Sequence, residues 1–325
     1  MPLATASTLP SLAQLESAAE LVHRFVPPTP QYSWPLVNAR AGCEVWIKHE
    51  NHTPIGAFKV RGGIVYMDWL RRNHPEAKGI ISATRGNHGQ SLAFAASRFG
   101  FPAVLVVPHG NSRDKNAAMR ALGAEVVEHG DDFHAADHHA DVLARDRGLV
   151  CIPAFDLLLV HGVASYALEL FRGAPPLDAV FVPIGWGSGS CGVAAARNAL
   201  NLQTRVIGVV SASAPAYALS FAQGRLVEKK STTRIADGVA ISRPHPAGFE
   251  ILRHELDKVV EVTDAEIEDT MRVIFSDTHN VAEGAGAAAV AALLKERDGW
   301  RDKRVGVILS GGNVDREIFA RVIAA

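Results

Sequence analysis

Residues 179–200 read AVFVPIGWGSGSCGVAAARNAL: an apolar run, then a glycine-rich turn, then a helical segment. The run AVFV is typical of a buried strand, and the glycines at 185, 187 and 189 allow the backbone to turn tightly. Several N–H groups would then point to one spot at a helix N-terminus, which suits an anion or a phosphate. A dinucleotide would also need an acidic residue after the next strand for its ribose, and that strand ends VVSAS without one. The turn therefore favours a phosphate without a ribose, with an ordinary tight turn as the alternative.

The same alternation of strand and helix runs through most of the chain. The strands that it predicts are 44–49, 79–83, 103–108, 124–129, 149–153, 179–184, 205–210, 258–262 and 304–310. The helix after Gly86 should stop at Gly100, and the helix from 264 has Asp264 as its expected N-cap. Strands that alternate with helices indicate parallel sheets covered on both faces. Because no flexible linker interrupts the chain, we expect two abutting open parallel-sheet α/β domains with a cleft between them.

Composition excludes several classes of protein. The 33 basic and 34 acidic side chains nearly cancel, and without a basic patch a nucleic-acid partner is not expected. Three cysteines without close pairing indicate a reducing compartment. The first 25 residues lack the features of a secretory signal, and the apolar runs are too short to span a bilayer. We expect a cytoplasmic protein that does not bind membranes.

Two further turns carry polar side chains at the ends of predicted strands. The segment 82–91, SATRGNHGQS, places Thr84, Arg85, Asn87 and His88 in a turn that could accept a carboxylate. The segment 310–315, SGGNVD, places the Ser310 hydroxyl at the carboxyl end of the last strand, where open α/β sheets bind ligands. Taken alone, either segment could be an ordinary surface turn.

Lys59 lies between Phe58 and Val60 in the stretch NHTPIGAFKVRGG, residues 51–63. An amine in apolar surroundings loses some preference for its charged form, so its pKa falls and the neutral nucleophile becomes accessible. A lysine for a Schiff base, a phosphate cradle, a carboxylate turn and a hydroxyl for a ring nitrogen together are the parts of a pyridoxal-phosphate site.

Through these motifs the chain resembles the fold-type II pyridoxal-phosphate enzymes, in particular the serine/threonine dehydratase and serine racemase family. The matching motifs are IGAFKVRGG, TRGNHGQS, VPIGWGSGSCG, TTRIADGVA, VAEGAGAAA and SGGNVD, in family order over nearly the whole chain. The resemblance implies a tryptophan synthase β-like fold, with a large cofactor-binding domain at 1–52 and 147–325 and a small mobile domain at 53–146. It also implies a homodimer that acts on a small amino-acid substrate.

The resemblance assigns roles residue by residue. Lys59 would carry the Schiff base and then act as general base at Cα. The expected cofactor contacts are Phe58, Asn87, the phosphate loop of Gly185, Trp186, Gly187, Ser188 and Gly189, and Ser310 at the pyridine nitrogen. The expected carboxylate contacts are Thr84, Arg85, Gly86, Asn87 and His88. A neutral Ser310 suits β-elimination better than transamination, so the implied activity is that of an ammonia-lyase that turns a β-hydroxy-L-amino acid into a 2-oxo acid and ammonia.

Four residues depart from the family pattern. Ala57 replaces the usual Ser before the lysine, and Trp186 interrupts the glycines of the phosphate loop together with Ser188. Arg85 stands where racemases carry the Ser that protonates the opposite face, which disfavours racemisation. These changes point towards a bulkier or differently charged substrate, such as a phenylserine or a hydroxyaspartate. Arg85 could meet a second carboxylate, stack on an aryl ring or bind the ordinary α-carboxylate.

Other interpretations stay open or are set aside. The family's divalent metal ligands align with Val210 and Ala216, so no metal site is expected. His134 and His138 lie one helical turn apart but fit a solvated helix face better than a metal cluster. Glu283 either faces the cleft or only caps the following helix. A β-replacement enzyme of the cysteine synthase type, an amino-acid racemase and a cofactor-free binding protein are the alternative functions.

Overall fold

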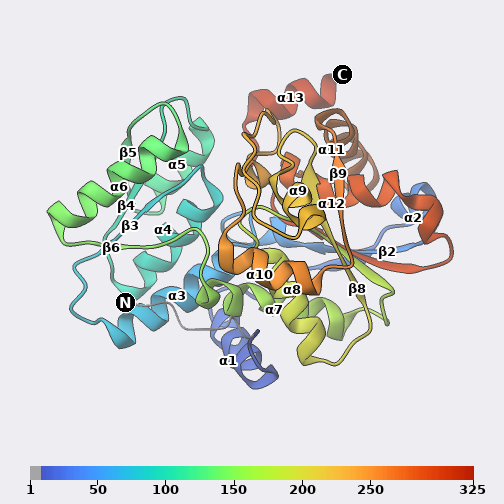
Figure 1. Ribbon diagram of the computed structural model, residues 1–325, viewed down its shortest axis with the longest axis horizontal. Coiled ribbons are helices and arrows are strands. Elements are labelled where there is room, and N and C mark those ends of the chain that lie inside the picture. The colour runs from blue at the N-terminus through green and yellow to red at the C-terminus, as the bar shows by residue number, and fades with distance from the viewer. Residues whose placement is uncertain (1–8) are drawn as a thin grey trace.

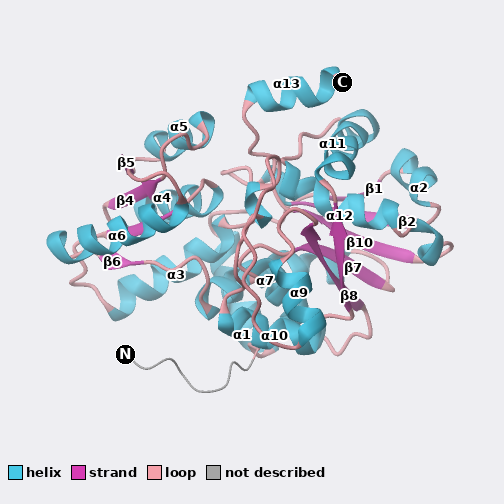
Figure 2. Ribbon diagram, turned by 45° about the horizontal axis from the view of Figure 1, so that its top comes forward, coloured by secondary structure: helices cyan, strands magenta, loops and turns pink. Residues whose placement is uncertain are grey.

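The computed structural model describes residues 9–325 and contains two β-sheets (Figures 1 and 2). The larger sheet has the strand order β1-β2-β10-β7-β8-β9, and the smaller has the order β5-β4-β3-β6. Strands of the larger sheet are β1 (Gln31–Ser33), β2 (Glu44–His49), β7 (Ala179–Pro183), β8 (Arg205–Ser211), β9 (Lys258–Val262) and β10 (Arg304–Leu309). Those of the smaller sheet are β3 (Ile80–Ala83), β4 (Ala103–Val107), β5 (Glu125–Glu128) and β6 (Val150–Cys151). Because the paired strands other than β1 run parallel, the expected α/β class with two parallel-sheet units is confirmed.

Helices cover both faces of the larger sheet. Phe181 points into the core under one face, whereas its neighbours Val180 and Val182 point into the core under the other, as the period of a strand requires. The first face packs against α2 (Pro35–Ala41), α11 (Asp264–Thr278), α12 (Gly284–Lys295) and α13 (Arg316–Ala324). The second packs against α1 (Leu12–His23), α7 (Leu157–Gly173), α8 (Ser188–Ala199), α9 (Ala216–Gln223) and α10 (Pro246–Glu255).

The smaller sheet is covered in the same way. Ile80 lies in a core with α3 (Val60–Asn73), α4 (Asn87–Phe99) and α5 (Arg113–Ala121), and Ile81 lies in a core with α6 (Phe133–Arg147). Helix α3 packs against both α4 and α7, so it lies between the helices of the two sheets, as Figure 1 shows. Short 3-10 turns are η1 (Glu50–His52), η2 (Asp237–Val239) and η3 (Arg297–Trp300).

The pattern of the sequence locates most elements and misplaces a few. Strand β1 was not expected because three residues are too few for an alternating pattern, and β6 is shorter than the predicted 149–153. The expectation that Asp264 is an N-cap is wrong: Thr263 caps α11 in a capping box with Glu266, and Asp264 is the first helical residue. Gly100 ends α4 in the left-handed conformation, as expected.

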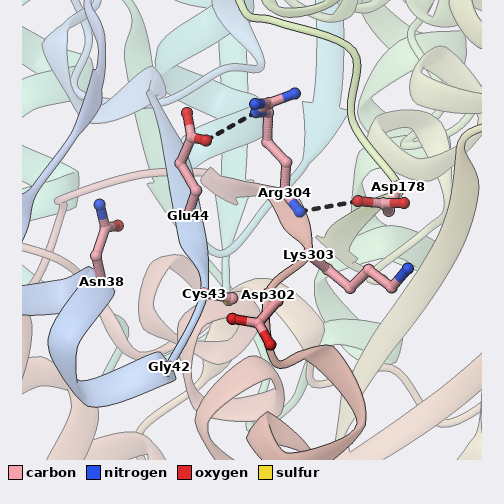
Figure 3. A pocket seen from close by; sticks show the side chains of 8 residues that line it. All are labelled: Asn38, Gly42, Cys43, Glu44, Asp178, Asp302, Lys303 and Arg304. Atoms are coloured by element: carbon pink, nitrogen blue, oxygen red, sulfur yellow. Dashed lines mark hydrogen bonds and ion pairs between the residues drawn. The ribbon is translucent and has the colours of Figure 1, made fainter.

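None of the helices described in residues 9–325 is long and apolar enough to cross a membrane. A surface pocket opens at the amino ends of β2, β7 and β10, where Arg304 pairs with Glu44 at 2.9 Å and its backbone N–H donates to Asp178 at 2.8 Å (Figure 3). A second pocket beside Phe171 and Trp300 lies at the same end of the sheet. Ligands of open α/β sheets bind at the opposite, carboxyl ends of the strands. A ligand is therefore expected at that opposite end.

Candidate active site

Four helix N-termini meet where the elements of the two sheets adjoin. Lys59 is the N-cap of α3, Asn87 opens α4, Ser188 opens α8 and Glu283 is the N-cap of α12. Asn87 bonds to Glu283, and a Cβ on Gly189 would lie 3.4 Å from the ring of the residue before Lys59, so these ends are in contact. Each helix N-terminus carries a partial positive charge and free N–H groups. The junction therefore favours an anionic ligand.

The amine of Lys59 lies in surroundings that disfavour its charge. Part of the side chain is accessible, yet desolvation by the surrounding protein lowers the pKa of Lys59 to about 8, and Glu283 opposes this only in part. The amine lies 5.2 Å from the centre of the Phe58 ring. At neutral pH a far larger fraction of this amine is neutral than of an ordinary lysine. This is the chemistry that the apolar neighbours in the sequence predict.

A buried ionic network fixes the start of α3 next to Lys59. Arg61 is fully buried, and its Nε donates to Glu50 at 2.7 Å while its Nη1 donates to Glu169 at 2.5 Å. Lys48 completes the network with a 2.6 Å ion pair to Glu169. Burial alone would raise the pKa of Glu169, but Arg61 and Lys48 outweigh it and lower that pKa to about 2. Because every charge is paired, the network holds the backbone at Lys59 in place.

The 84–88 turn leaves two backbone donors at the start of α4. The Thr84 hydroxyl accepts hydrogen bonds from the N–H groups of Gly86 and Gly89, both at 3.0 Å. The N–H groups of Asn87 and His88 in the first turn of the helix have no carbonyl of their own helix to bind. His88 is buried, and desolvation followed by the nearby charge of Lys59 lowers its pKa to about 3, so its ring is neutral. The turn thus offers donors to a carboxylate without a second titrating base.

The side chain of Arg85 contacts η2, which packs against α12 of the larger sheet. Its Nη1 donates to Asp237 of η2 at 3.1 Å, and both side chains are more than two-fifths exposed. The guanidinium therefore uses one of its five donors in this pair. Its remaining N–H groups are free to meet a second carboxylate, an aryl ring or the α-carboxylate of a substrate.

Glu283 faces the junction rather than only capping α12. Its side chain makes no capping bond; Oε1 instead accepts from Asn87 Nδ2 at 2.5 Å and Oε2 accepts from Lys115 Nζ at 3.0 Å. Asn313 donates to Asn87 Oδ1 at 2.9 Å. Neither Lys115 nor Asn313 was expected from the sequence, because each reaches Asn87 or Glu283 only through the tertiary arrangement of the sheets.

Neighbouring residues pack closely against the glycines of the 185–189 loop. Gly187 has φ 104°, and a Cβ there would lie 2.8 Å from Tyr217 Oη; a Cβ at Gly185 would overlap the carbonyl of Gly238. Trp186, which replaces a glycine of the family pattern, is partly buried and its ring lies 6.0 Å from Phe133 of α6. The indole thus packs between the core of the larger sheet and α6 of the smaller sheet.

The backbone of Ser310 and Gly311 lies beside the segment that precedes Lys59, where Ala57 and Gly311 form an isolated antiparallel bridge. Phe58 N–H donates to the Ser310 carbonyl at 3.1 Å, and the buried Ser310 hydroxyl lies 3.5 Å from the Ala285 carbonyl. Ala57 is fully buried, and both its N–H and its carbonyl bond to the Thr53 hydroxyl at 2.9 Å. A hydroxyl is therefore present near this position in the chain, but it serves the backbone of the turn.

The positions aligned with metal ligands are apolar and buried. Val210 is 1% exposed and Ala216 is 0% exposed. In the part of the chain that the structure describes, no three His, Cys, Asp or Glu side chains gather closely enough to hold a metal ion. His134 and His138 have no third ligand there.

Comparison with known proteins places the fold and the motifs in one family. Residues 22–311 match the family described as pyridoxal-phosphate dependent enzyme. The L-threonine ammonia-lyase of Thermotoga maritima is 34% identical over 283 residues, which cover 87% of this chain and 70% of the relative. The catabolic L-threonine dehydratase of Escherichia coli is 34% identical over 279 residues, covering 85% of this chain and 84% of that one.

Solved structures agree with this result. The processed form of threonine deaminase isoform 2 from Solanum lycopersicum superposes with a TM-score of 0.89 at 28% identity, over 100% of this chain and 98% of the other. The match covers both sheets and every motif of the resemblance. The resemblance inferred from those motifs is confirmed: the chain belongs to the family of pyridoxal-phosphate-dependent enzymes.

Proposed function

We propose that the protein is an ammonia-lyase that converts a β-hydroxy-L-amino acid, such as threonine or serine or one with a bulkier β-substituent, to a 2-oxo acid and ammonia. The observation that carries the proposal is the amine of Lys59, whose pKa is lowered to about 8 at the junction of the glycine-rich loop and the 84–88 turn. The names of the relatives, L-threonine ammonia-lyase and L-threonine dehydratase, support the substrate class.

The residues at the junction fit pyridoxal phosphate. The N-terminus of α8 and the glycines that leave no room for side chains form a cradle for its phosphate, and the Tyr217 hydroxyl beside Gly187 is buried without a partner among the described residues. Lys59 would hold the aldehyde carbon, Asn87 the phenolic oxygen and Ser310 the ring nitrogen, with Phe58 packed against the group. When bound, pyridoxal phosphate withdraws electrons from the Cα of the amino acid and so acidifies its proton.

The chain's own groups then divide the work. The free N–H groups of Asn87 and His88 hold the α-carboxylate at the start of α4. Lys59, whose amine is readily neutral, removes the Cα proton. The β-hydroxyl leaves with one proton as water, and a later addition of water releases ammonia and the 2-oxo acid, so the atoms balance. Ser310 carries no charge and does not hold a proton on the ring, which suits loss of a β-substituent over transamination.

A substrate panel tests the proposal. Purified holoenzyme is incubated with threonine, serine, phenylserine and β-hydroxyaspartate, and both ammonia and the 2-oxo acid are measured, with Lys59→Met as the control that should form neither. Release of both products in equal amounts from at least one substrate is expected. Failure with all four, combined with a reaction of O-acetylserine and sulfide, would establish β-replacement instead. A protein that binds no cofactor would be the binding protein of the third alternative.

We further propose that the protein is a homodimer in the cytoplasm. Tyr32 in the edge strand β1 and Leu36 in α2 are 52% and 58% exposed, which supports a homodimer that covers them. The cysteines Cys43, Cys151 and Cys191 are all free, which supports a reducing compartment such as the cytoplasm. Sedimentation equilibrium would test the dimer, and a sedimenting mass of one chain would overturn it.

We also propose the domain boundaries predicted from the resemblance, with a large domain at 1–52 and 147–325 and a small mobile domain at 53–146. The sheets support this division for β3, β4 and β5, which lie within 53–146, whereas β6 (Val150–Cys151) pairs with β3 and so moves the second boundary beyond residue 151. Hydrogen exchange with and without a substrate analogue would test the mobility of the small domain. Uniform protection of both units in both states would contradict it.

A further inference from the structure

We propose that Glu283 and Asn313 are positioning residues that clamp the amide of Asn87, so that one N–H of this amide is presented to an acceptor oxygen of the ligand. The inference rests on the proposed function only through the choice of pyridoxal phosphate as that ligand, whose phenolic oxygen is the acceptor. It assigns a task to two residues outside the glycine-rich loop, the lysine segment and the 84–88 turn.

Asn313 fixes one side of the Asn87 amide. Its Nδ2 donates to the Ile55 carbonyl at 2.7 Å and to Asn87 Oδ1 at 2.9 Å. A backbone carbonyl only accepts, so the atom of Asn313 that faces it must be the nitrogen. Both hydrogens of that nitrogen are then used. The atom of Asn87 that receives the second one must be its oxygen.

Glu283 fixes the other side. An ionised carboxylate only accepts, so the atom of Asn87 that lies 2.5 Å from Glu283 Oε1 must be the nitrogen. The Lys115 ammonium lies 3.0 Å from Oε2 and forms an ion pair with this buried carboxylate. A flipped Asn87 would place donor against donor and oxygen against carboxylate. Two independent neighbours therefore select the same orientation, and the second hydrogen of Asn87 Nδ2 is left for a ligand.

Lys115 extends the clamp across the junction. It belongs to α5 of the smaller sheet, whereas Glu283 precedes α12 of the larger one. The Lys115 side chain lies against Gly86, where a Cβ would overlap it, so the 84–88 turn can approach this pair only with glycine at that position. The side chains of Lys115 and Glu283 are 8% and 6% exposed. Removal of one charge alone would leave the other buried and unpaired, so a charge-balanced comparison is needed.

The test compares two double variants, Glu283→Gln/Lys115→Met and Glu283→Leu/Lys115→Met. Both lack the ion pair, and Gln and Leu have similar volumes, but only Gln retains an acceptor for Asn87 Nδ2. The dissociation constant of pyridoxal phosphate is measured by equilibrium dialysis and the absorbance maximum of the bound cofactor is recorded. Because a lost hydrogen-bond partner frees the amide to rotate, the Leu variant should bind the cofactor about tenfold more weakly than the Gln variant. Its absorbance maximum should also shift.

Two further variants keep the result interpretable. Asn313→Leu removes the other side of the clamp and should weaken cofactor binding in the same direction, whether or not the double variants fold. Asp277→Asn is the matched control, because Asp277 is also buried and bonded to an arginine, at 2.5 Å from Arg40 Nε, but lies in α11 outside the site. It should lower the melting temperature and leave the cofactor constant and spectrum unchanged.

Equal dissociation constants and identical spectra for the Gln and Leu variants would overturn the proposal, as would an unchanged constant in Asn313→Leu. These readouts do not require turnover. If the substrate panel yields no 2-oxo acid while the two double variants still differ in cofactor binding, the proposed activity fails and the clamp stands.

Discussion

Two lysines that lie close together in the sequence are desolvated by the fold, and they differ in what surrounds the amine. Lys48 is 0% exposed and forms a 2.6 Å ion pair with Glu169, and it also donates to the Thr29 carbonyl at 2.8 Å. Lys59 forms no ion pair with any carboxylate in residues 9–325. Its amine instead lies over the Phe58 ring, 5.2 Å from the ring centre. Desolvation lowers both pKa values, but only around Lys48 do neighbouring carboxylates compensate at contact distance.

Desolvation alone therefore does not distinguish a structural lysine from a reactive one. What matters is whether acceptors satisfy the ammonium after water has been removed. At Lys48 they do, and the charge becomes part of the network that anchors α3 through Arg61. At Lys59 no carboxylate lies at contact distance, so the amine loses its proton more easily and need not break an ion pair in order to react. Substitutions at the two positions should have opposite consequences.

The largest effect is expected on turnover. Lys59→Met removes the group that we place at the Cα proton, and loss of a general base typically lowers the rate by about 10² to 10⁴-fold. We expect kcat for the best substrate of the panel to fall by at least that lower bound. Stopped assays of 2-oxo acid measure it. Retention of more than a tenth of the parent activity would show that another group removes the proton.

The next effect is on folding. Lys48→Met leaves Glu169 with one cation fewer in a buried site, and breaking a buried pair costs about 3 kcal/mol of the free energy of unfolding. Urea unfolding of the cofactor-free chain measures this, with Lys295→Met as a control. Lys295 pairs with Glu266 but is 41% exposed, so its loss should cost less than about 0.5 kcal/mol. Equal effects at the two positions would mean that the buried network adds nothing.

The comparison is sharpest in the pH dependence of stability. The pKa of Lys59 is 10.5 when exposed and about 8 in the folded chain, so between these values the unfolded chain binds a proton that the folded chain does not. Stability of the cofactor-free parent should rise across that window, and below pH 8 the full penalty of burying the ammonium applies. Lys59→Met avoids this penalty and should be more stable than the parent by about 3 kcal/mol at pH 7. The difference should vanish near pH 10.5.

Thermal or urea unfolding at several pH values tests the sign. Lys48→Met should be less stable than the parent over the same range, and Lys59→Met more stable. A Lys59→Met chain that is less stable than the parent at pH 7 would mean that its ammonium is satisfied by groups such as ordered water, and the contrast between the two lysines would be lost.

The parts of the site that are local in the chain were predictable from the sequence. Lys59 between apolar neighbours, the glycines of the 185–189 loop and the polar turn after β3 each show their chemistry within about ten residues, because a strand, a turn and a helix start are set by neighbours in sequence. The alternating strands indicated the α/β class for the same reason. The three-residue strand β1 could not be predicted from its own sequence, since it forms only by pairing with the backbone of β2.

Contacts between distant segments were not predictable in this way. Glu283 bonds to Lys115 and Asn87, which precede it by 168 and 196 residues, and no periodicity links such positions. The sequence indicated Glu283 as a candidate site residue, because a glutamate directly before a helix of small residues either caps that helix or faces the cleft. The choice between these depends on how the smaller sheet lies against the larger one. Arg85 is a similar case, since its partner Asp237 is 152 residues away.

Substitution of Arg85 should have the smallest effect on stability, because its ion pair is exposed where that of Lys48 is buried. Its pair with Asp237 is more than two-fifths exposed on both sides, so Arg85→Ala should change the free energy of unfolding by less than about 0.5 kcal/mol, in contrast to Lys48→Met. Its effect on substrates separates the interactions that its position allows. If the Asn87 and His88 N–H groups suffice for the α-carboxylate, the KM for threonine should change little. A rise in KM that is confined to β-hydroxyaspartate would assign the guanidinium to a second carboxylate, whereas an equal rise for all substrates would place it on the α-carboxylate after all.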